Sequence, residues 1–144
     1  MQFPTVVRII FLSIYMISCS LGLMAQPSEA ALGLWLTDEG ESHVKIFRDG
    51  EEFKGKIVWL RNPKDDRGQP VTDDNGDPVL NMVFMTEFVY EDGEYVDGKV
   101  YNPKTGKTYY GSMELDGKNV LKLRGSLDQT GWFGRTETWT RVKE

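Results

Sequence analysis

The sequence predicts an all-β protein, namely a small antiparallel up-and-down β-barrel of about eight strands. Short stretches of alternating apolar and polar residues recur along the chain, and glycine-containing turn signals separate them. Helical spacing is weak and confined to Val79–Phe88. A barrel also removes the two bare edges that an open sheet would present. A two-sheet sandwich is the alternative architecture.

Residues 1–25 are predicted to form a secretory signal peptide, because Arg8 precedes an apolar run that ends in small residues. Cleavage after Ala25 or as late as Ala30 would suit a signal peptidase. The alternative is an uncleaved anchor, but several serines and Gly22 dilute the run. We therefore expect a secreted or periplasmic protein.

Cys19 is the only cysteine, so the mature domain has no intramolecular disulfide. The preceding Met16-Ile17-Ser18 resembles the lipobox of bacterial lipoproteins, although the apolar run continues past the cysteine. Cys19 is therefore either discarded with the signal peptide or lipidated, which would make the chain an outer-membrane lipoprotein. Membrane contact is expected only through the signal segment or a lipidated Cys19.

The charge and length of the chain limit the classes of function. Its 144 residues carry a formal net charge of −5, which argues against general nucleic-acid binding. A single histidine, His43, and no usable cysteine argue against the common zinc and cysteine-nucleophile sites. We expect no cofactor and no metal.

Residues 26–32 are predicted to be a flexible lead-in, and residues 33–144 to form one barrel domain. Gly33–Thr37 is the first strand, and Asp38-Glu39-Gly40 stops it.

The first hairpin joins Val44–Arg48 to Phe53–Leu60, because Asp49-Gly50 is typical of a tight turn. Phe53, Gly55, Ile57 and Trp59 alternate with polar residues, which predicts that Trp59 lies on the buried face.

Arg61–Pro78 is a long loop rich in Pro, Gly, Asn and Asp, and loops of this length are often functional. Its acidic group comprises Asp73, Asp74, Asn75 and Asp77. The spacing imitates the start of an EF-hand, but Pro78 occupies the position that requires glycine. Turn chemistry is the expected role of these side chains.

Five more strands follow, separated by turns rich in Gly, Pro, Asn and Asp. They are Met82–Tyr90, Tyr95–Tyr101, Lys107–Leu115, Asn119–Ser126 and Phe133–Val142. Tyr109 and Met113 share one face of the third of these and are candidates for core or pocket wall.

The last strand offers two orientations. Arg135, Glu137, Trp139 and Arg141 share one face. If this face points inward, Glu137 needs a partner, and Arg124 on the preceding strand could pair with it or bind a ligand carboxylate. If it points outward, these charges form an exposed cross-strand ladder. The ligand-binding candidates are therefore Arg124 and Glu137, with Trp59 and Tyr109.

Three stretches together resemble a secreted bacterial family, domain of unknown function 2147. They are GLWLTDEG, GKIVWLRNPKDDRGQPVTDDN, and KTGKTYYGSMELDGKNVLKLRG followed by GRTETWTR. The resemblance spans Gly33 to Val142 and implies a lipocalin-like barrel, with no established general function. The chain departs from the family pattern at Leu80–Met85, at Tyr95 and at Asn102-Pro103.

Gly33-x-Trp35 and Arg141 are similar to the lipocalin arrangement, in which a first-strand tryptophan packs beneath a last-strand arginine. Cation–π stacking worth about 0.5–2 kcal/mol would stabilise this barrel plug.

A suggested acid peptidase activity also comes with the resemblance. An aspartic dyad needs two adjacent carboxylates that share a proton. The chain has no Asp-Thr-Gly or Asp-Ser-Gly triplet, so candidates must come from Asp65, Asp66, Asp73 and Asp97. His43 is a lone histidine on a predicted strand, so polar surface is its expected role rather than Ser/His/Asp catalysis.

The favoured hypothesis is a secreted cell-envelope barrel that binds a small apolar or amphipathic ligand or a partner protein. The alternatives are an acid peptidase that uses loop aspartates and a structural envelope domain that oligomerises through exposed strand faces.

Overall fold

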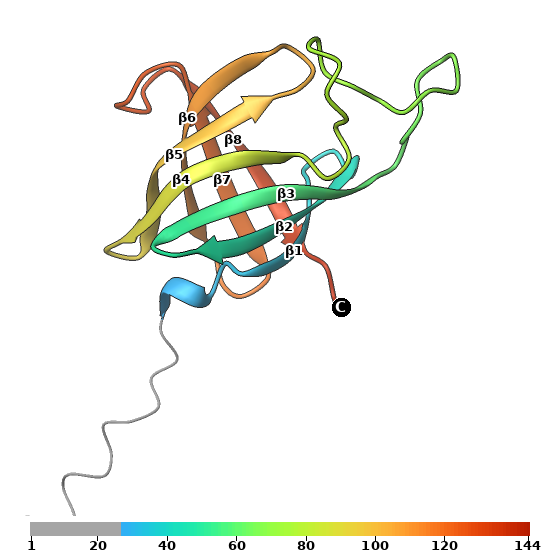
Figure 1. Cartoon of the computed structure of the whole chain (residues 1–144). Coiled ribbons are helices and arrows are strands. Elements are labelled where there is room, and N and C mark those ends of the chain that lie inside the picture. The colour runs from blue at the N-terminus through green and yellow to red at the C-terminus, as the bar shows by residue number, and fades with distance from the viewer. Residues whose placement is uncertain (1–26) are drawn as a thin grey trace, which may run out of the picture.

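Eight antiparallel strands close into one barrel, in which each strand pairs with the next and β8 pairs with β1 (Figure 1). The structure is a computed structural model that describes residues 27–144. The strands are β1 (Gly33–Leu36), β2 (Ser42–Asp49), β3 (Glu52–Leu60), β4 (Val83–Glu91), β5 (Glu94–Asn102), β6 (Lys107–Leu115), β7 (Val120–Ser126) and β8 (Gly134–Arg141), preceded by the 3-10 helix η1 (Pro27–Glu29). The predicted all-β barrel of eight strands is confirmed, and the sandwich alternative is wrong.

The N-terminal predictions concern residues that the structure does not describe. The signal peptide over residues 1–25, cleavage after Ala25 and lipidation of Cys19 all lie outside the described residues. From residue 27 to residue 144, no helix has the length and apolar character needed to cross a bilayer.

Turns set the hairpin register where the sequence predicts them. Gly50 and Gly117 have φ angles of 65° and 77° and follow aspartates at the β2–β3 and β6–β7 turns. This left-handed conformation favours glycine, so each Asp-Gly pair can reverse the chain within a few residues.

The closure of the barrel is uneven. β7 and β8 share seven register pairs, whereas β1 and β8 share only two, Trp35↔Arg141 and Leu36↔Thr140. A further backbone hydrogen bond runs from Val142 N–H to Leu34 O, at 2.8 Å. The β1–β8 seam is therefore the shortest junction in the barrel.

A bulge explains the weak helical spacing around Val79–Phe88. Glu87 has a φ of 65°, and the β3–β4 register shifts between the pair Phe53↔Phe88 and the pair Gly55↔Met85. The extra residue lets Met85 and Phe88, three positions apart, both point inward, and both side chains are fully buried. The helical interpretation is wrong because residues 79–82 end the preceding loop and residues 83–88 belong to strand β4, which contains an irregularity.

Large side chains fill the interior. The most buried are Trp35, Val44, Ile46, Phe53, Met85, Phe88, Tyr95, Leu121 and Trp139. The Phe88 ring lies directly against Gly98 and Gly111, because a Cβ atom at either position would lie 2.3 Å or 2.7 Å from Phe88 Cζ. Wall glycines thus leave room for a large ring at the centre.

The two ends of the barrel differ. The closed end holds η1 and the short β2–β3, β4–β5 and β6–β7 turns, whereas the loop-bearing end holds the other four connections (Figure 1). The β3–β4 connection, residues 61–82, projects from the loop-bearing end as two small fingers (Figure 1).

Residues 27–32 pack against the closed end, so the predicted flexible lead-in is wrong for this stretch. Ala31 is fully buried, and its N–H donates to the Tyr95 hydroxyl at 3.1 Å. That hydroxyl donates to Ser28 O at 2.7 Å, and Trp35 Nε1 donates to Ala31 O at 2.9 Å. The reason is that buried polar groups of Tyr95 and Trp35 need partners, and the lead-in backbone supplies them.

Candidate functional site

Trp35 and Arg141 meet at the closed end. The Arg141 guanidinium carbon lies 4.3 Å from the centre of the Trp35 ring, and the indole is fully buried. The same guanidinium donates to the carbonyls of Ala30, Leu32 and Lys118 at 2.7, 2.9 and 2.8 Å. It therefore ties the lead-in, β1 and the β6–β7 turn together over the end of the barrel.

The tryptophan-bearing face of β8 points inward. Trp139 is 1% exposed, and Glu137 pairs in register with the buried Leu123. Glu137 is half-buried and accepts a hydrogen bond from Trp139 Nε1 at 3.0 Å. The outward salt-bridge ladder is therefore wrong, because it needs Trp139 on the surface.

Arg124 lies on the opposite face from Glu137, so the predicted pairing between them is wrong. Its register partner is Thr136, whose hydroxyl accepts from Arg124 Nη1 at 3.2 Å. Arg124 Nε donates to Gly131 O at 2.7 Å, which holds the β7–β8 loop from outside. One register position separates the two candidates, and in a strand one position changes the face.

Trp59 also departs from the predicted inner face. The β2–β3 register changes between Val44↔Ile57 and His43↔Trp59, so Val58 is an extra residue. Beyond this irregularity Trp59 turns outward, is 41% exposed and stacks on the His43 ring at 4.5 Å. Strict alternation fails here because a bulge reverses it.

The inner wall near the loop-bearing end carries four half-buried side chains, which we call the inner rim. They are Phe84, Val100, Tyr109 and Glu137. Phe84 and Val100 pack on the buried core, whereas Tyr109 lies beside Gly125, where an added Cβ would be 3.7 Å from Tyr109 Cβ. Met113, two positions from Gly111, belongs to the filled core. An apolar surface with one carboxylate suits an amphipathic ligand.

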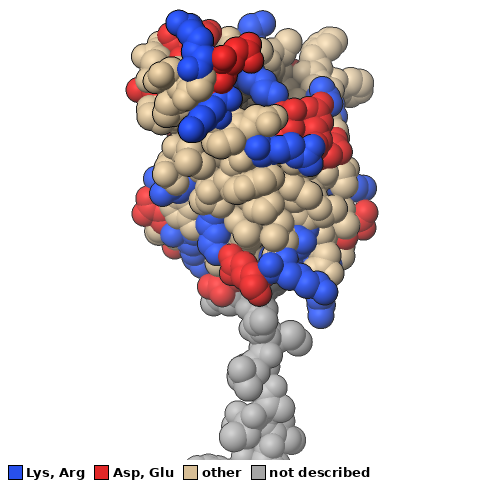
Figure 2. Space-filling model, turned by 90° about the vertical axis from the view of Figure 1, so that its right-hand side faces the viewer, with Lys and Arg blue, Asp and Glu red and all other residues tan. Residues whose placement is uncertain are grey.

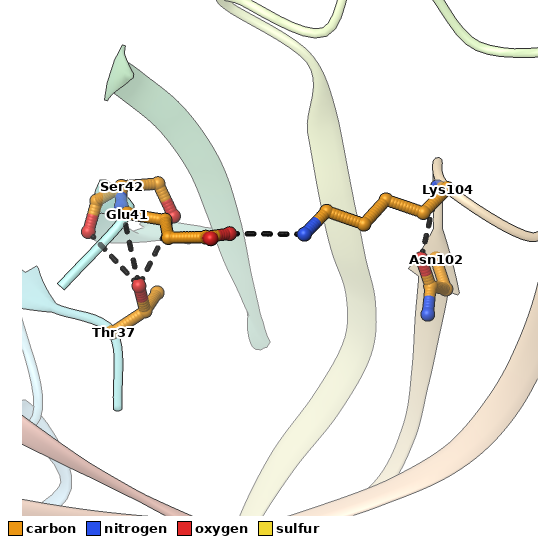
Figure 3. A network of polar contacts seen from close by, with 5 residues as sticks. All are labelled: Thr37, Glu41, Ser42, Asn102 and Lys104. Carbon is orange, nitrogen blue, oxygen red and sulfur yellow. Dashed lines mark hydrogen bonds and ion pairs between the residues drawn. The ribbon is translucent and has the colours of Figure 1, made fainter. Parts of the chain in front are cut away.

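An ion pair spans the loop-bearing end (Figure 3). Lys104 Nζ lies 2.9 Å from Glu41 Oε2. Glu41 precedes β2 and Lys104 follows β5, so the pair joins opposite sides of the cyclic strand order. The hydrogen bond to Lys104 lowers the pKa of Glu41. The same bond raises the pKa of Lys104, and the negative charges of Glu41, Glu39 and Glu137 add to it.

Local hydrogen bonds hold both partners of this ion pair (Figure 3). The Thr37 hydroxyl bonds the Ser42 carbonyl, hydroxyl and N–H at 3.2–3.3 Å, which fixes the turn that bears Glu41. Asn102 Oδ1 accepts from the Lys104 N–H at 2.9 Å. The ion pair therefore links two ordered turns.

The two fingers of the β3–β4 loop come from an internal repeat. KDDRGQPV, residues 64–71, is followed directly by TDDNGDPV, residues 72–79. Each unit forms an antiparallel bridge, Lys64↔Pro70 in the first and Thr72↔Pro78 in the second. The first aspartate of each unit, Asp65 or Asp73, accepts two backbone N–H groups from the following residues at 2.9–3.0 Å. The eight-residue period is visible in the sequence and predicts this pairing of like turns.

The Asp73 side chain is more buried than that of Asp65. It is 7% exposed, and its second oxygen accepts the Tyr101 hydroxyl at 2.9 Å. Hydrogen bonds from the Asp77 N–H, the Tyr101 hydroxyl and the Asn75 N–H lower the pKa of Asp73. The hydrogen bond from Tyr101 fastens the second finger to β5.

Replacing Tyr101 with phenylalanine should raise the pKa of Asp73 towards its ordinary value, since one donor to the carboxylate is lost. The folded-state pKa of Asp73 lies below its unfolded value, so its stabilising contribution is present above about pH 4 and is lost as pH falls through the folded pKa. An NMR titration of the Asp73 carboxyl carbon measures the shift. Tyr110→Phe is the control, because Tyr110 packs under Lys99 instead. Equal Asp73 titration in both variants would contradict this role of Tyr101.

The other loop acids are exposed, and Asp97 lies apart from them. Asp66, Asp74 and Asp77 are on the surface, as is the neighbouring amide Asn75. Asp97 has a φ of 58° at an irregularity of β5 between Tyr95 and Gly98. In residues 27–144 no hydrogen bond joins two of the four peptidase candidates, and no group of three ligating side chains is placed to hold a metal ion.

A cleft of about 200 Å³ opens on the outer surface of β6–β8. Its polar lining includes Ser112, Lys122, Arg124 and Thr136. It is separate from the inner rim, whose residues face the barrel interior.

The comparisons with known proteins agree with this architecture. The family described as "Uncharacterized protein conserved in bacteria (DUF2147)" matches residues 33–141. The chain is also similar to a solved structure, protein HP1028 from the human pathogen Helicobacter pylori, which is described as belonging to the lipocalin family. The similarity has a TM-score of 0.64 and 23% identity, and covers 78% of this chain and 83% of that one. No curated protein matches the chain.

Proposed function

The chain belongs to the bacterial family DUF2147, and from that premise we propose that it binds a small apolar or amphipathic ligand at the inner rim of its lipocalin-like barrel. Eight-stranded barrels have room for side chains or for one small ligand. The proposal draws on a fold-level analogy, and the inner rim gives it a specific location.

The observation that carries the proposal is the contrast between the two halves of the interior. Towards the closed end, the plug and fully buried aromatic side chains fill the space. Towards the other end, Phe84, Val100 and Tyr109 are only half-buried although they face inward. Apolar surface left partly exposed inside a barrel is surface that a ligand can cover.

The charges around the inner rim suggest how an amphipathic ligand would lie. Its apolar part would contact Phe84, Val100 and Tyr109, and its polar end would lie near Glu137 and the Lys104–Glu41 ion pair. A ligand with both a positive and a negative group would meet an opposite charge for each. The ligand stays shallow, because Phe88 and Trp139 occupy the space below.

We place this activity in the cell envelope. The support is the basic start and apolar run of residues 1–25, which are typical of exported proteins. In this proposal the chain is secreted or periplasmic, and a lipidated Cys19 would hold it at the outer membrane.

Native mass spectrometry of the chain isolated from its own host tests ligand binding. Gly125→Leu should reduce the ligand-bound fraction about tenfold or more, because its first carbon fits beside Tyr109 and the rest fills the inner rim. Lys122→Leu is the matched control, since it places the same side chain on the outer face of β7. Absence of any co-purified small molecule, or equal binding by Gly125→Leu, would count against the proposal.

Self-association is a second candidate function, favoured by an exposed apolar patch where β3 ends and β4 begins. The patch comprises Val58, Trp59, Leu80 and Val83, each 37–43% exposed. Figure 2 shows this side of the molecule with a broad uncharged area between charged ends. Size-exclusion chromatography with light scattering should give a dimer or larger species that Trp59→Ser converts to monomer. A monomer at every concentration would exclude this function.

A further inference from the structure

The β7–β8 loop, residues 127–133, presents an apolar tip at the loop-bearing end. The tip consists of Leu127, Trp132 and Phe133, which are 68%, 83% and 74% exposed. No other large apolar side chain in residues 27–144 is more than 43% exposed. Three such side chains gathered on one short loop suggest a contact surface rather than scattered surface residues.

Arg124 on the outer face of β7 and polar residues of the loop itself hold the apolar tip in shape. Arg124 on β7 donates through Nε to Gly131 O at 2.7 Å, and through Nη2 to the Gly131 and Trp132 carbonyls. Asp128 Oδ1 accepts from the Phe133 N–H at 3.1 Å, and the Thr130 hydroxyl donates to its other oxygen. The tip is therefore preformed, which lowers the entropy lost when it binds.

The same contacts satisfy much of the loop backbone internally. The Leu127 N–H donates to Phe133 O at 3.0 Å, and the Gly131 N–H donates to Asp128 O at 3.3 Å. Asp128 O also accepts the Ser126 hydroxyl at 2.7 Å. Because Arg124 and Asp128 direct their charges at the loop itself, the tip can leave water without exposing many unpaired polar groups to an apolar phase.

The apolar area of the tip favours a lipid surface over a protein as its partner. Three large apolar side chains offer on the order of 450 Å², whereas a stable protein interface takes about 800 Å² from each side. An interfacial insertion needs only a few apolar and aromatic groups, and tryptophan favours the boundary between lipid and water. We propose that the apolar tip inserts into a lipid surface.

Quenching by lipids with brominated acyl chains tests this directly in the full chain. The readout must be local to the tip, because the apolar run of residues 9–25 can itself bind vesicles. With phosphatidylcholine or phosphatidylglycerol vesicles, we expect quenching of the emission component that Trp132→Phe removes. Trp35 and Trp139 are buried in the barrel and should not be quenched.

Two double variants distinguish insertion of the apolar tip from non-specific adsorption of the protein to lipid. Leu127→Ser with Phe133→Ser keeps the Trp132 reporter and should weaken its partition into vesicles about tenfold or more. Val58→Ser with Leu80→Ser removes exposed apolar residues elsewhere and should leave the quenching unchanged. The proposal is overturned if Trp132 is not quenched by either lipid or if the tip variant is quenched equally. Shielding of Trp132 from aqueous acrylamide as protein concentration rises without lipid would also overturn it, in favour of a second copy of the chain.

Discussion

Replacing Gly98 with alanine is expected to lower the free energy of unfolding by about 3 kcal/mol, an unusually large effect for one added methyl group. The new Cβ would lie 2.3–2.4 Å from three carbons of the Phe88 ring. Phe88 is fully buried, and its ring also lies against Gly111 of β6, where an added Cβ would be 2.7 Å from Phe88 Cζ. The ring has no free space into which it could move, so the backbone of β5 must shift.

Urea unfolding followed by circular dichroism measures this change. Gly125→Ala is the matched control, because its Cβ would meet no atom nearer than 3.7 Å, and its effect should stay well below that of Gly98→Ala. Phe88→Leu should remove most of the added penalty when combined with Gly98→Ala, which a double-mutant cycle reports. Equal destabilisation by the two alanine variants would show that Phe88 packing is not what requires glycine.

Replacing Arg141 with methionine is expected to destabilise the barrel by about 3 kcal/mol. The variant loses the stacking on Trp35 and leaves three carbonyls, those of Ala30, Leu32 and Lys118, without their donor. Methionine preserves much of the packing, so the loss reports mainly the guanidinium. Lysine at the same position should rescue only part of it, because one ammonium cannot reach three carbonyls in a fixed plane.

The Arg141→Met variant should change local hydrogen exchange as well as the global stability of the barrel. Amide hydrogen exchange should accelerate most in residues 30–33 and at the β6–β7 turn, which Arg141 joins. Arg135→Met is the control, because Arg135 lies on the same face of β8 but is exposed near the other end. If the two arginine variants have the same stability and exchange, the plug does not stabilise the barrel.

The strands were predictable because two local signals agree. Alternation with a period of two marks Lys107–Leu115 correctly to the residue, and the Asp116-Gly117 turn separates this strand from the next. The sequence also places Gly33, Trp35 and Arg141 at opposite chain ends where a closed barrel can bring them together. Their contact depends on the fold rather than on local pattern.

The misplaced residues share one physical cause. Trp59 follows a bulge, so counting by twos assigns it to the wrong face. Met85 and Phe88 flank another irregularity, which gives their strand its weak helical spacing. The adjacency of their strands predicts a pair between Arg124 and Glu137, but the register puts Arg124 opposite Thr136. Bulge position and register depend on contacts between strands, which periodicity within one strand does not contain.

The order within residues 27–32 was missed for a different reason. Its small and polar residues have no strand or helix pattern, so the stretch reads as disordered. Its order comes from Tyr95 and Arg141, whose polar atoms bind its backbone from distant parts of the chain.

Because the seam between β1 and β8 is short, the contact between Trp35 and Arg141 has a second consequence. If the seam opened, two strand edges would be freed, and each could pair with the matching edge of another molecule to form a domain-swapped dimer or a growing polymer. Arg141 binds across that junction from β8 to Leu32, the residue just before β1. The same guanidinium that closes the barrel therefore also protects the chain from intermolecular strand exchange.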